Sequence, residues 1–221
     1  MNKLKRLLLK RYLKRFIVNS FHKLYYHTET TTWHNTFWLG IHTDKCPLDL
    51  WNYQEIIFEV EPDVIIETGT GCGGSSLFFA SICDLINKGR VISIDLEDVS
   101  KKPQHKRIRY LSGSSISKEI EKQVQQLVSD DDKVLVDLDS DHTKEHVLQE
   151  LTIYSKLVTP DSYIIVEDTN LGGHPVKPHR YPGPMEAVKE FLKTNPNFII
   201  DKSREKFYLT FNPNGYLKRV K

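Results

Sequence analysis

The chain has 221 residues, of which 39% are hydrophobic and 27% charged, and its formal net charge is +2. This length supports one well-packed domain and leaves little material for a second independent core. The composition is typical of a soluble protein, and no segment approaches the roughly 20 continuous apolar residues of a membrane span. A membrane-spanning protein is therefore not expected.

The charge is distributed unevenly along the chain. Residues 1–27 contain eight Lys or Arg residues and no acid, whereas the remainder holds 23 basic and 29 acidic residues. Leu4, Leu8, Tyr12 and Phe16 recur at helical spacing between basic flanks. Two interpretations stay open: this helix packs against its own domain or a second copy of the chain, or it lies on an anionic membrane surface. Nucleic acid is not an expected partner, because no recognition motif accompanies the charge.

The cysteines indicate a reducing compartment. Cys46, Cys72 and Cys83 have neither paired nor metal-type spacing, so no disulfide framework is implied. Basic residues interrupt the early leucine run, which argues against a secretory signal. The expected location is the cytoplasm, at the inner face of the membrane if residues 1–27 bind lipid.

The middle of the chain alternates between strand and helix patterns. Residues 28–50 lack a clear period and predict an irregular cap, and a helix is expected over 51–61. Short β-branched runs then predict strands at 63–67, 90–95, 108–111, 133–138 and 162–167. Segments of helical length lie near 75–88, 115–128, 143–157 and 184–194. This alternation predicts a parallel sheet with helices on both faces, closed by an antiparallel hairpin of residues 197–201 and 206–211.

The expected organisation has three parts: a basic amphipathic helix over 1–27, a cap and helix over 28–61, and an α/β domain over 62–221.

A glycine-rich loop follows the first expected strand of this domain. The string ETGTGCGGSS begins at Glu67 and contains Gly69, Gly71 and Gly74. Glycines let the backbone approach a ligand, and the helix that follows offers free N–H groups at its N-terminus. Asp95, at the end of the next strand, can accept hydrogen bonds from both hydroxyls of a ribose. The loop predicts a nucleoside-type ligand but does not separate a dinucleotide from adenosylmethionine.

Acidic residues end two further strands. Asp137, Asp139 and Asp141 follow the fourth strand, and Glu167 and Asp168 follow the fifth. The carboxyl ends of parallel strands open into one crevice, so these carboxylates should converge near the glycine loop. They would repel one another without a cation, and hard oxygen ligands suit Mg²⁺.

Three other interpretations compete with this one. His142, Glu145 and His146 match the H-x-x-E-H pattern of a zinc peptidase. Asp137 and Asp139 match the D-x-D of a metal-dependent nucleotide-sugar glycosyltransferase. A nicotinamide dehydrogenase would explain the glycines but not the acids on the second wall of the crevice.

Several segments in a fixed order resemble the cephalosporin hydroxylase and rhamnosyl O-methyltransferase family over residues 36–218. They are ETGTGCGGSSLFFA, VISIDLED, GSS at 113–115, VDLDSDHTKEHVLQEL, YIIVEDTN, GPMEAVKEFL and NPNGYLKR. The resemblance implies the Rossmann-like fold of class I methyltransferases, with a mostly parallel seven-stranded sheet, a C-terminal antiparallel hairpin and helices on both faces. It also implies adenosylmethionine as cofactor and magnesium as metal.

The resemblance assigns roles to particular residues. Asp141, Glu167 and Asp168 match the metal ligands of the family. The expected cofactor-binding residues are Glu67, Gly69, Thr70, Gly71, Ser75, Asp95, Ser115 and Asp139. The order Asp141, His142, Lys144 is also similar to catechol O-methyltransferase, in which the lysine is the base. Related sugar O-methyltransferases use a histidine or a metal-bound acid instead, so these three residues are alternative catalytic candidates here.

The expected reaction is methyl transfer to an acceptor hydroxyl whose pKa the metal lowers while a base removes the proton. The acceptor is expected to be a small molecule or a glycan, and the basic N-terminal segment favours a sugar on a membrane-associated glycan. Residues 169–184 form a long aperiodic segment that we interpret as an acceptor-binding lid. A non-catalytic module that retains the cofactor pocket is the alternative outside the enzymes.

Overall fold

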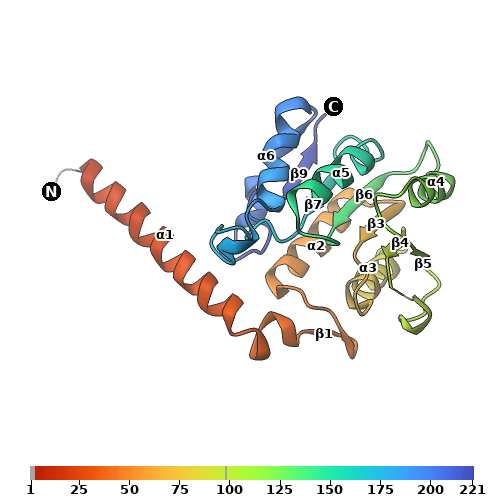
Figure 1. Cartoon of the computed structure of the whole chain (residues 1–221), viewed down its shortest axis with the longest axis horizontal. Helices are drawn as coiled ribbons and strands as arrows, with labels where there is room; N and C mark the ends of the chain where they lie inside the picture. The colour runs from red at the N-terminus through yellow and green to blue at the C-terminus, as the bar shows by residue number, and fades with distance from the viewer. Residues whose placement is uncertain (1–2, 98) are drawn as a thin grey trace.

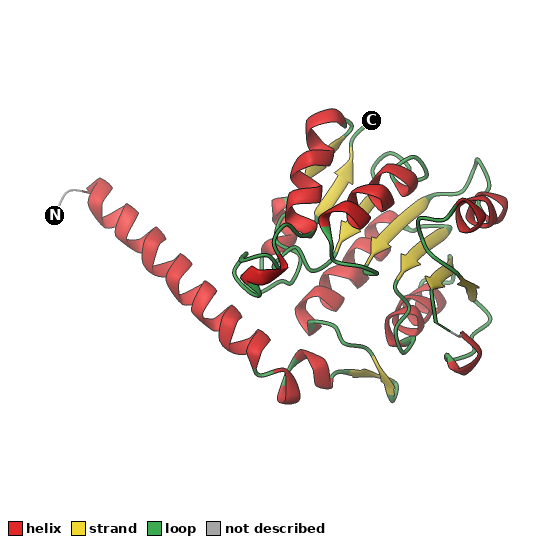
Figure 2. Cartoon of the chain, in the orientation of Figure 1, coloured by secondary structure: helices red, strands yellow, loops and turns green. Residues whose placement is uncertain are grey.

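The computed structural model describes residues 3–97 and 99–221. An N-terminal part precedes the sheet domain (Figures 1 and 2) and consists of α1 (Lys3–His27), the 3-10 turns η1 (Glu29–Thr31) and η2 (Trp33–Asn35), β1 (Phe37–Trp38), β2 (Ile41–His42) and α2 (Pro47–Val60). The strands of the main sheet are β3 (Val64–Thr68), β4 (Arg90–Asp95), β5 (Ile108–Ser112), β6 (Val134–Leu138), β7 (Tyr163–Val166), β8 (Phe198–Ile200) and β9 (Tyr216–Arg219). The helices among them are α3 (Gly74–Leu85), α4 (Lys118–Leu127), α5 (Lys144–Tyr154) and α6 (Pro184–Thr194), with short 3-10 turns η3 (Val99–Lys101), η4 (Pro178–Arg180) and η5 (Lys202–Glu205).

The seven-stranded sheet has the order β5-β4-β3-β6-β7-β9-β8. Neighbouring strands run parallel from β5 to β7, and β9 is antiparallel to both β7 and β8. The strand order reverses at β3, whose neighbours are β4 and β6, so a crevice opens at the carboxyl ends of these strands. The expected mostly parallel seven-stranded fold is confirmed.

Alternate residues of each buried strand enter two separate hydrophobic layers. Ile65, Leu135 and Ile165 pack with α2 and α3 on one face of the sheet. Val64 and Val136 pack with α4, α5 and α6 on the other face. The strands therefore read as continuous apolar runs rather than alternating ones, because both faces are covered. Since α2 contributes to the same core as the sheet, residues 28–61 do not form a core of their own.

The C-terminal hairpin differs from its prediction in one strand. β8 lies within the expected segment 197–201, but its antiparallel partner is β9 and not residues 206–211. The apolar side chains of Leu209 and Phe211 instead enter a third cluster with Tyr26 and Leu171. Residues 206–211 thus pack beneath the N-terminal segment, and Gly215 and the residues after it return the chain to the edge of β7.

Helix α1 extends away from the body of the molecule over most of its length (Figure 1). Its last two turns dock through His22 and Tyr26, which are buried. Upstream, six apolar side chains lie more than half exposed: Leu8, Leu9, Tyr12, Leu13, Phe16 and Ile17. The side chain of Leu4 lies outside the described residues. Among the described helices, none combines the length and the apolar character that crossing a membrane requires.

Candidate active site

A cavity of about 560 Å³ opens at the carboxyl ends of β3, β4 and β6. Its lining includes seven of the eight expected cofactor residues: Gly69, Thr70, Gly71, Ser75, Asp95, Ser115 and Asp139. The glycine loop forms one wall and the chain after β5 forms another. The topology thus brings together residues that are up to 70 positions apart in the sequence.

Gly69 is the tightest point of the glycine loop. Its φ is +84°, and a Cβ built there would lie 2.0 Å from the backbone oxygen of Asp139. No side chain fits between these two strands' ends, so the sequence requires glycine at this position. Gly71 also has a positive φ, of +51°, but a Cβ there would meet no atom within 4 Å.

Asp95 and Glu67 stabilise the loop in different ways. Asp95 lines the cavity, and its Oδ2 accepts a hydrogen bond of 2.8 Å from the Gly71 N–H. Glu67 is fully buried and does not line the cavity. Its carboxylate accepts hydrogen bonds from the hydroxyls of Ser76 and Ser93 beneath the loop. Burial raises the pKa of Glu67, and these hydroxyls act in the opposite direction. The structure therefore places Glu67 as a support of the loop.

A buried lysine that the sequence analysis did not single out lies among the acids. Lys45 immediately precedes α2, and its side chain is only 3% exposed. Its Nζ lies 2.5 Å from Asp139 Oδ2 and 3.9 Å from Asp137 Oδ2, and it also donates a short hydrogen bond to Glu167. Both side-chain oxygens of Asp137 lack a hydrogen-bond partner among the described residues. One ammonium thus faces three carboxylates.

The pKa values of Asp137, Glu167 and Lys45 reflect burial and the excess of negative charge in this cluster. Burial, together with the neighbouring acids Asp139 and Glu67, raises the pKa of Asp137 to about 7, although Lys45 acts in the opposite direction. Burial, Asp137 and Asp139 likewise hold the pKa of Glu167 well above its usual range. Burial alone would lower the pKa of Lys45, but the three carboxylates hold it well above its usual range. Added positive charge would therefore be favourable here.

A second cavity of about 370 Å³ adjoins the first, and both include Asp44 and Asp139 in their linings. His142 and Asp168 lie on its floor, with His142 Nε2 3.3 Å from Asp168 Oδ2. One ligand atom each from Asp139, His142 and Asp168 lies within 4.8 Å of the others, a spacing that could hold a metal ion. Burial raises the pKa of Asp168, while His142 acts against this shift.

Two of the expected residues lie outside the group formed by Asp139, His142 and Asp168. Asp141 lines the first cavity but is exposed, and its Oδ1 accepts a hydrogen bond of 2.7 Å from the N–H of Thr143, just before α5. It is absent from the groups of described residues whose spacing could hold a metal. Lys144 lines neither cavity and pairs with Glu190 of α6 at 2.6 Å, and this hydrogen bond raises the pKa of Lys144.

The H-x-x-E-H interpretation fails on geometry. His142 faces Asp168, whereas His146 Nε2 lies 3.1 Å from the hydroxyls of both Ser115 and Ser140. The two histidines therefore engage different partners and do not share a ligand position, although one helical turn separates them in the sequence.

The family described as Rhamnosyl O-methyltransferase/CmcI matches residues 30–220. The rhamnosyl O-methyltransferase of Mycobacterium leprae (strain TN) is 38% identical over 209 residues, which cover 92% of this chain and 90% of that protein.

Solved structures share the fold at lower sequence identity. A structure of CmcI with Mg and SAM superimposes with a TM-score of 0.66 at 20% identity, covering 85% of this chain and 78% of that one. MycE from the mycinamycin biosynthetic pathway, in complex with Mg and SAH, gives a TM-score of 0.52 at 17% identity over 67% of this chain and 44% of that one.

Proposed function

Because the chain belongs to the Rhamnosyl O-methyltransferase/CmcI family, we propose that it transfers a methyl group from adenosylmethionine to a sugar hydroxyl with the assistance of Mg²⁺. The enzyme class expected from the sequence, an S-adenosylmethionine-dependent O-methyltransferase, is confirmed by this membership. The single observation that supports the site assignment is the meeting of two cavities at Asp139, one bounded by the glycine loop and the other by His142 and Asp168.

The first cavity is the proposed cofactor site. Its volume and its position at the strand reversal suit a nucleoside-sized ligand. Asp95 lines this cavity at the position proposed for a ribose. Gly69, which lies close to the backbone of Asp139, presents only backbone atoms to the ligand. Ser75 and Ser115 are proposed contacts, while Thr70 bonds to Ser93 and positions the loop.

The proposed metal ligands are Asp139, Glu167 and Asp168. The set differs from the sequence-based one in a single member, because Asp139 and not Asp141 lies within reach of Asp168. Lys45 pairs with Asp139 and Glu167, and His142 lies beside Asp168. Burial raises the pKa values of Glu167 and Asp168, and the neighbouring carboxylate of Asp139 acts in the same direction. Hard oxygen donors of this kind suit Mg²⁺.

When bound, Mg²⁺ supplies Lewis acidity to an acceptor hydroxyl and adenosylmethionine supplies the methyl group. His142 is the proposed base, since it faces the second cavity and Asp168 holds its Nε2 in place. Lys144 is not available for this role because Glu190 engages it outside the cavities. Lys45 holds the carboxylates of Asp139 and Glu167 together.

The second cavity is the proposed acceptor site. Tyr26 and Trp33 contribute aromatic side chains to its lining, and the segment 169–184 contributes Lys177, His179 and Arg180. Aromatic rings and cationic donors together suit a sugar with polar or anionic substituents. The lid role of residues 169–184 is supported by this lining. The acceptor class, a rhamnosyl-type deoxysugar hydroxyl, is proposed from the named relative.

The N-terminal segment is proposed as a membrane-binding element. Its apolar residues Leu8, Leu9 and Leu13 are exposed, and basic residues at 10, 11, 14 and 15 alternate with them. A helix of this kind gains both apolar burial and charge neutralisation on an anionic bilayer. The alternative is that the same residues are buried against a second copy of the chain. Vesicle binding distinguishes the two. The division into 1–27, 28–61 and 62–221 is thus proposed as anchor, cap and catalytic unit.

The proposed function is tested by methyl transfer itself. Purified chain is incubated with methyl-labelled adenosylmethionine and rhamnose-containing glycolipids, over a Mg²⁺ titration and in EDTA. Labelled, base-stable sugar ether that requires Mg²⁺ is the expected product. Cofactor binding without transfer to any glycan would identify a non-catalytic module, and glycosyl transfer from a nucleotide sugar would identify a glycosyltransferase.

A further inference from the structure

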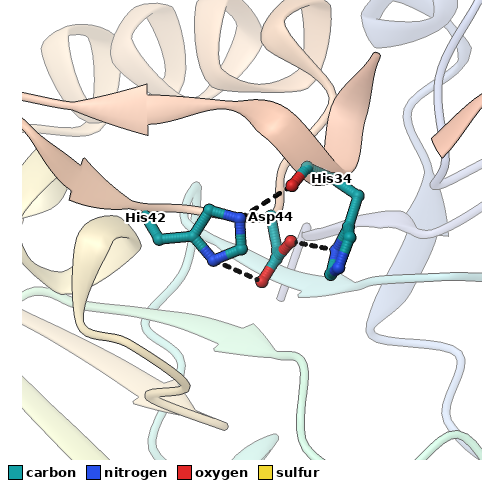
Figure 3. A group of neighbouring side chains, drawn as sticks. All are labelled: His34, His42 and Asp44. Carbon is teal, nitrogen blue, oxygen red and sulfur yellow. Dashed lines mark hydrogen bonds and ion pairs between the residues drawn. The ribbon is translucent and has the colours of Figure 1, made fainter. Parts of the chain in front are cut away.

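Three side chains converge at the rim of the active site, outside the proposed magnesium ligands. His34 of η2 and His42 of β2 both face the carboxylate of Asp44, and Figure 3 shows the two rings on either side of it. His34 Nδ1 lies 2.5 Å from Asp44 Oδ1, and His42 Nδ1 lies 3.2 Å from Asp44 Oδ2. One ligand atom from each residue lies within 4.8 Å of the others, as in a metal-binding group.

The hydrogen bonding of His42 fixes which of its nitrogens faces the carboxylate. Its Nε2 lies 2.7 Å from the backbone oxygen of His34, and a carbonyl oxygen can only accept, so Nε2 carries the hydrogen. In the neutral ring, Nδ1 then presents a lone pair to Asp44 Oδ2. A histidine that donates one N–H to a backbone carbonyl and directs its other nitrogen at a cation is the common arrangement of metal-binding histidines.

Cys72, from a different part of the chain, lies beside this group but outside the set of residues whose ligand atoms are all within 4.8 Å of one another. It belongs to the glycine loop, and its Sγ lies 3.9 Å from His42 Nδ1. Cys46 and Cys83 are buried, whereas Cys72 is exposed. Tetrahedral zinc bonds of about 2.0 to 2.3 Å place neighbouring ligand atoms about 3.3 to 3.6 Å apart. The observed separations of 2.5, 3.2 and 3.9 Å bracket these values.

The backbone of Asp44 also indicates a constrained position. Its φ is +54°, in the left-handed region that residues other than glycine adopt infrequently. Its Oδ1 is buried and has no hydrogen-bond partner among the described residues, despite the proximity of His34 Nδ1. An aspartate held in this conformation, with each carboxylate oxygen facing a different imidazole, suits a metal-ligand position.

We propose that His34, His42, Asp44 and Cys72 bind one transition-metal ion of the Zn²⁺ type, at a site separate from the magnesium ligands. Imidazole and thiolate ligands favour such an ion over Mg²⁺. Binding displaces the thiol proton of Cys72 to solvent, after which one thiolate, one carboxylate and two neutral imidazoles balance the charge of a divalent ion. The ion ties the β1–β2 segment to the glycine loop, and Asp44 and Cys72 both line the cofactor cavity. This inference does not depend on the proposed methyl transfer.

The test uses the full-length chain, stripped with EDTA and returned to chelator-free buffer. Co²⁺ is titrated as a spectroscopic substitute for Zn²⁺, because a cobalt–thiolate bond gives a charge-transfer absorption in the near ultraviolet. The expected result is that one equivalent of Co²⁺ produces this absorption and that Zn²⁺ abolishes it by displacement. The absorption distinguishes this site from Asp139, His142 and Asp168, which include no cysteine.

Variants assign the ligands. Cys72→Ser and His42→Gln are each expected to abolish the absorption, and His42→Gln to weaken Zn²⁺ binding by more than about tenfold. His34→Gln, whose side chain is exposed, repeats the test if His42→Gln does not fold.

Two controls should keep the absorption: Asp168→Asn, which alters the magnesium ligands, and His105→Gln, which removes a His–Asp pair of 3.1 Å elsewhere on the surface. Absence of the absorption in the wild type, or its persistence in both histidine variants, would overturn the proposal.

Discussion

The ammonium of Lys45 lies 2.5 Å from the carboxylate of Asp139, and the two residues are separated by 94 positions in the sequence. This contact joins the start of α2 to the carboxyl end of β6. Among the described residues, Lys45 is the only cation that pairs with Asp137, Asp139 and Glu167.

Replacing Lys45 by Met should therefore destabilise the metal-free protein. The variant leaves carboxylates facing one another in a buried site, a change that costs about 3 to 5 kcal/mol when one partner of a buried pair is removed. Urea unfolding in EDTA measures the loss, and added Mg²⁺ should recover more stability in Lys45→Met than in wild type. Lys88→Met is the matched control, since Lys88 and Asp63 form a partly exposed pair worth about 1 kcal/mol at most. Equal stability of Lys45→Met and wild type in EDTA would contradict the role of Lys45.

Magnesium affinity should separate Asp139 from Asp141. Asp139→Asn removes a charged oxygen from the group that includes Asp168, whereas Asp141→Asn alters an exposed residue that bonds the N–H of Thr143 before α5. Calorimetric titration with Mg²⁺ is expected to show a loss of at least about tenfold in affinity for Asp139→Asn. Asp141→Asn should bind Mg²⁺ as wild type does. The reverse order would restore Asp141 as the ligand and remove Asp139 from the set.

Two glycine variants test the close approach in the glycine loop. Gly69→Ala places a Cβ against the Asp139 backbone oxygen and should abolish adenosylmethionine binding. Gly71→Ala also adopts a positive φ, but its Cβ meets no atom within 4 Å, so its cost should stay near the 1 kcal/mol typical of left-handed backbone. Calorimetry with adenosylmethionine compares them, and circular dichroism verifies the fold. Similar binding by both variants would mean that the loop rearranges freely.

The docking of α1 should depend on pH through His22. Burial lowers the pKa of this imidazole to about 4, and its Nε2 accepts a hydrogen bond from the Asn170 amide. The folded protein therefore binds fewer protons at His22 than the unfolded chain does between about pH 6.5 and pH 4, and stability falls as the pH falls through this window. We expect a loss of about 2 kcal/mol between pH 7 and pH 5 from this group.

His22→Gln keeps a hydrogen-bond acceptor but cannot titrate. The free energy of unfolding, measured with urea at both pH values, should fall less steeply with acid in this variant than in wild type. An identical pH dependence in the two proteins would show that His22 is protonated without cost, or that the helix is already detached.

Membrane binding should depend on the exposed face of α1. Substituting Glu for both Leu9 and Leu13 places charge in the apolar stripe, at side chains that contact little of the body of the protein. Co-sedimentation with anionic vesicles is expected to decrease strongly, and adenosylmethionine binding should not change. Vesicles of zwitterionic lipid serve as the control surface, to which wild type should bind weakly. If wild type does not co-sediment with anionic vesicles, sedimentation equilibrium of both proteins decides whether the stripe joins two copies of the chain.

The sequence by itself determined the sheet and the cofactor loop. Strands β3, β4, β6 and β7 are continuous apolar runs because both faces of the sheet are covered, and such runs are recognisable without a structure. The glycine loop and Asp95 follow strands directly, so the position of each strand end fixes where they lie. The expected hairpin was wrong in its second strand, because residues 206–211 are as apolar and as aromatic as a strand but bury Leu209 and Phe211 against Tyr26.

Only the tertiary structure decided which polar groups meet. Nothing local to Lys45 distinguishes it from the other lysines of the chain; its role follows from the turn before α2, which carries it beneath the ends of β6 and β7. Asp139 and Asp141 are equally acidic in the sequence and both line the first cavity, but only Asp139 comes within reach of His142 and Asp168, whereas Asp141 accepts a hydrogen bond from the N–H of Thr143. His34, His42, Asp44 and Cys72 likewise come together from separate loops. Local sequence encodes backbone conformation and burial, whereas contacts between distant side chains depend on how the loops cross in space.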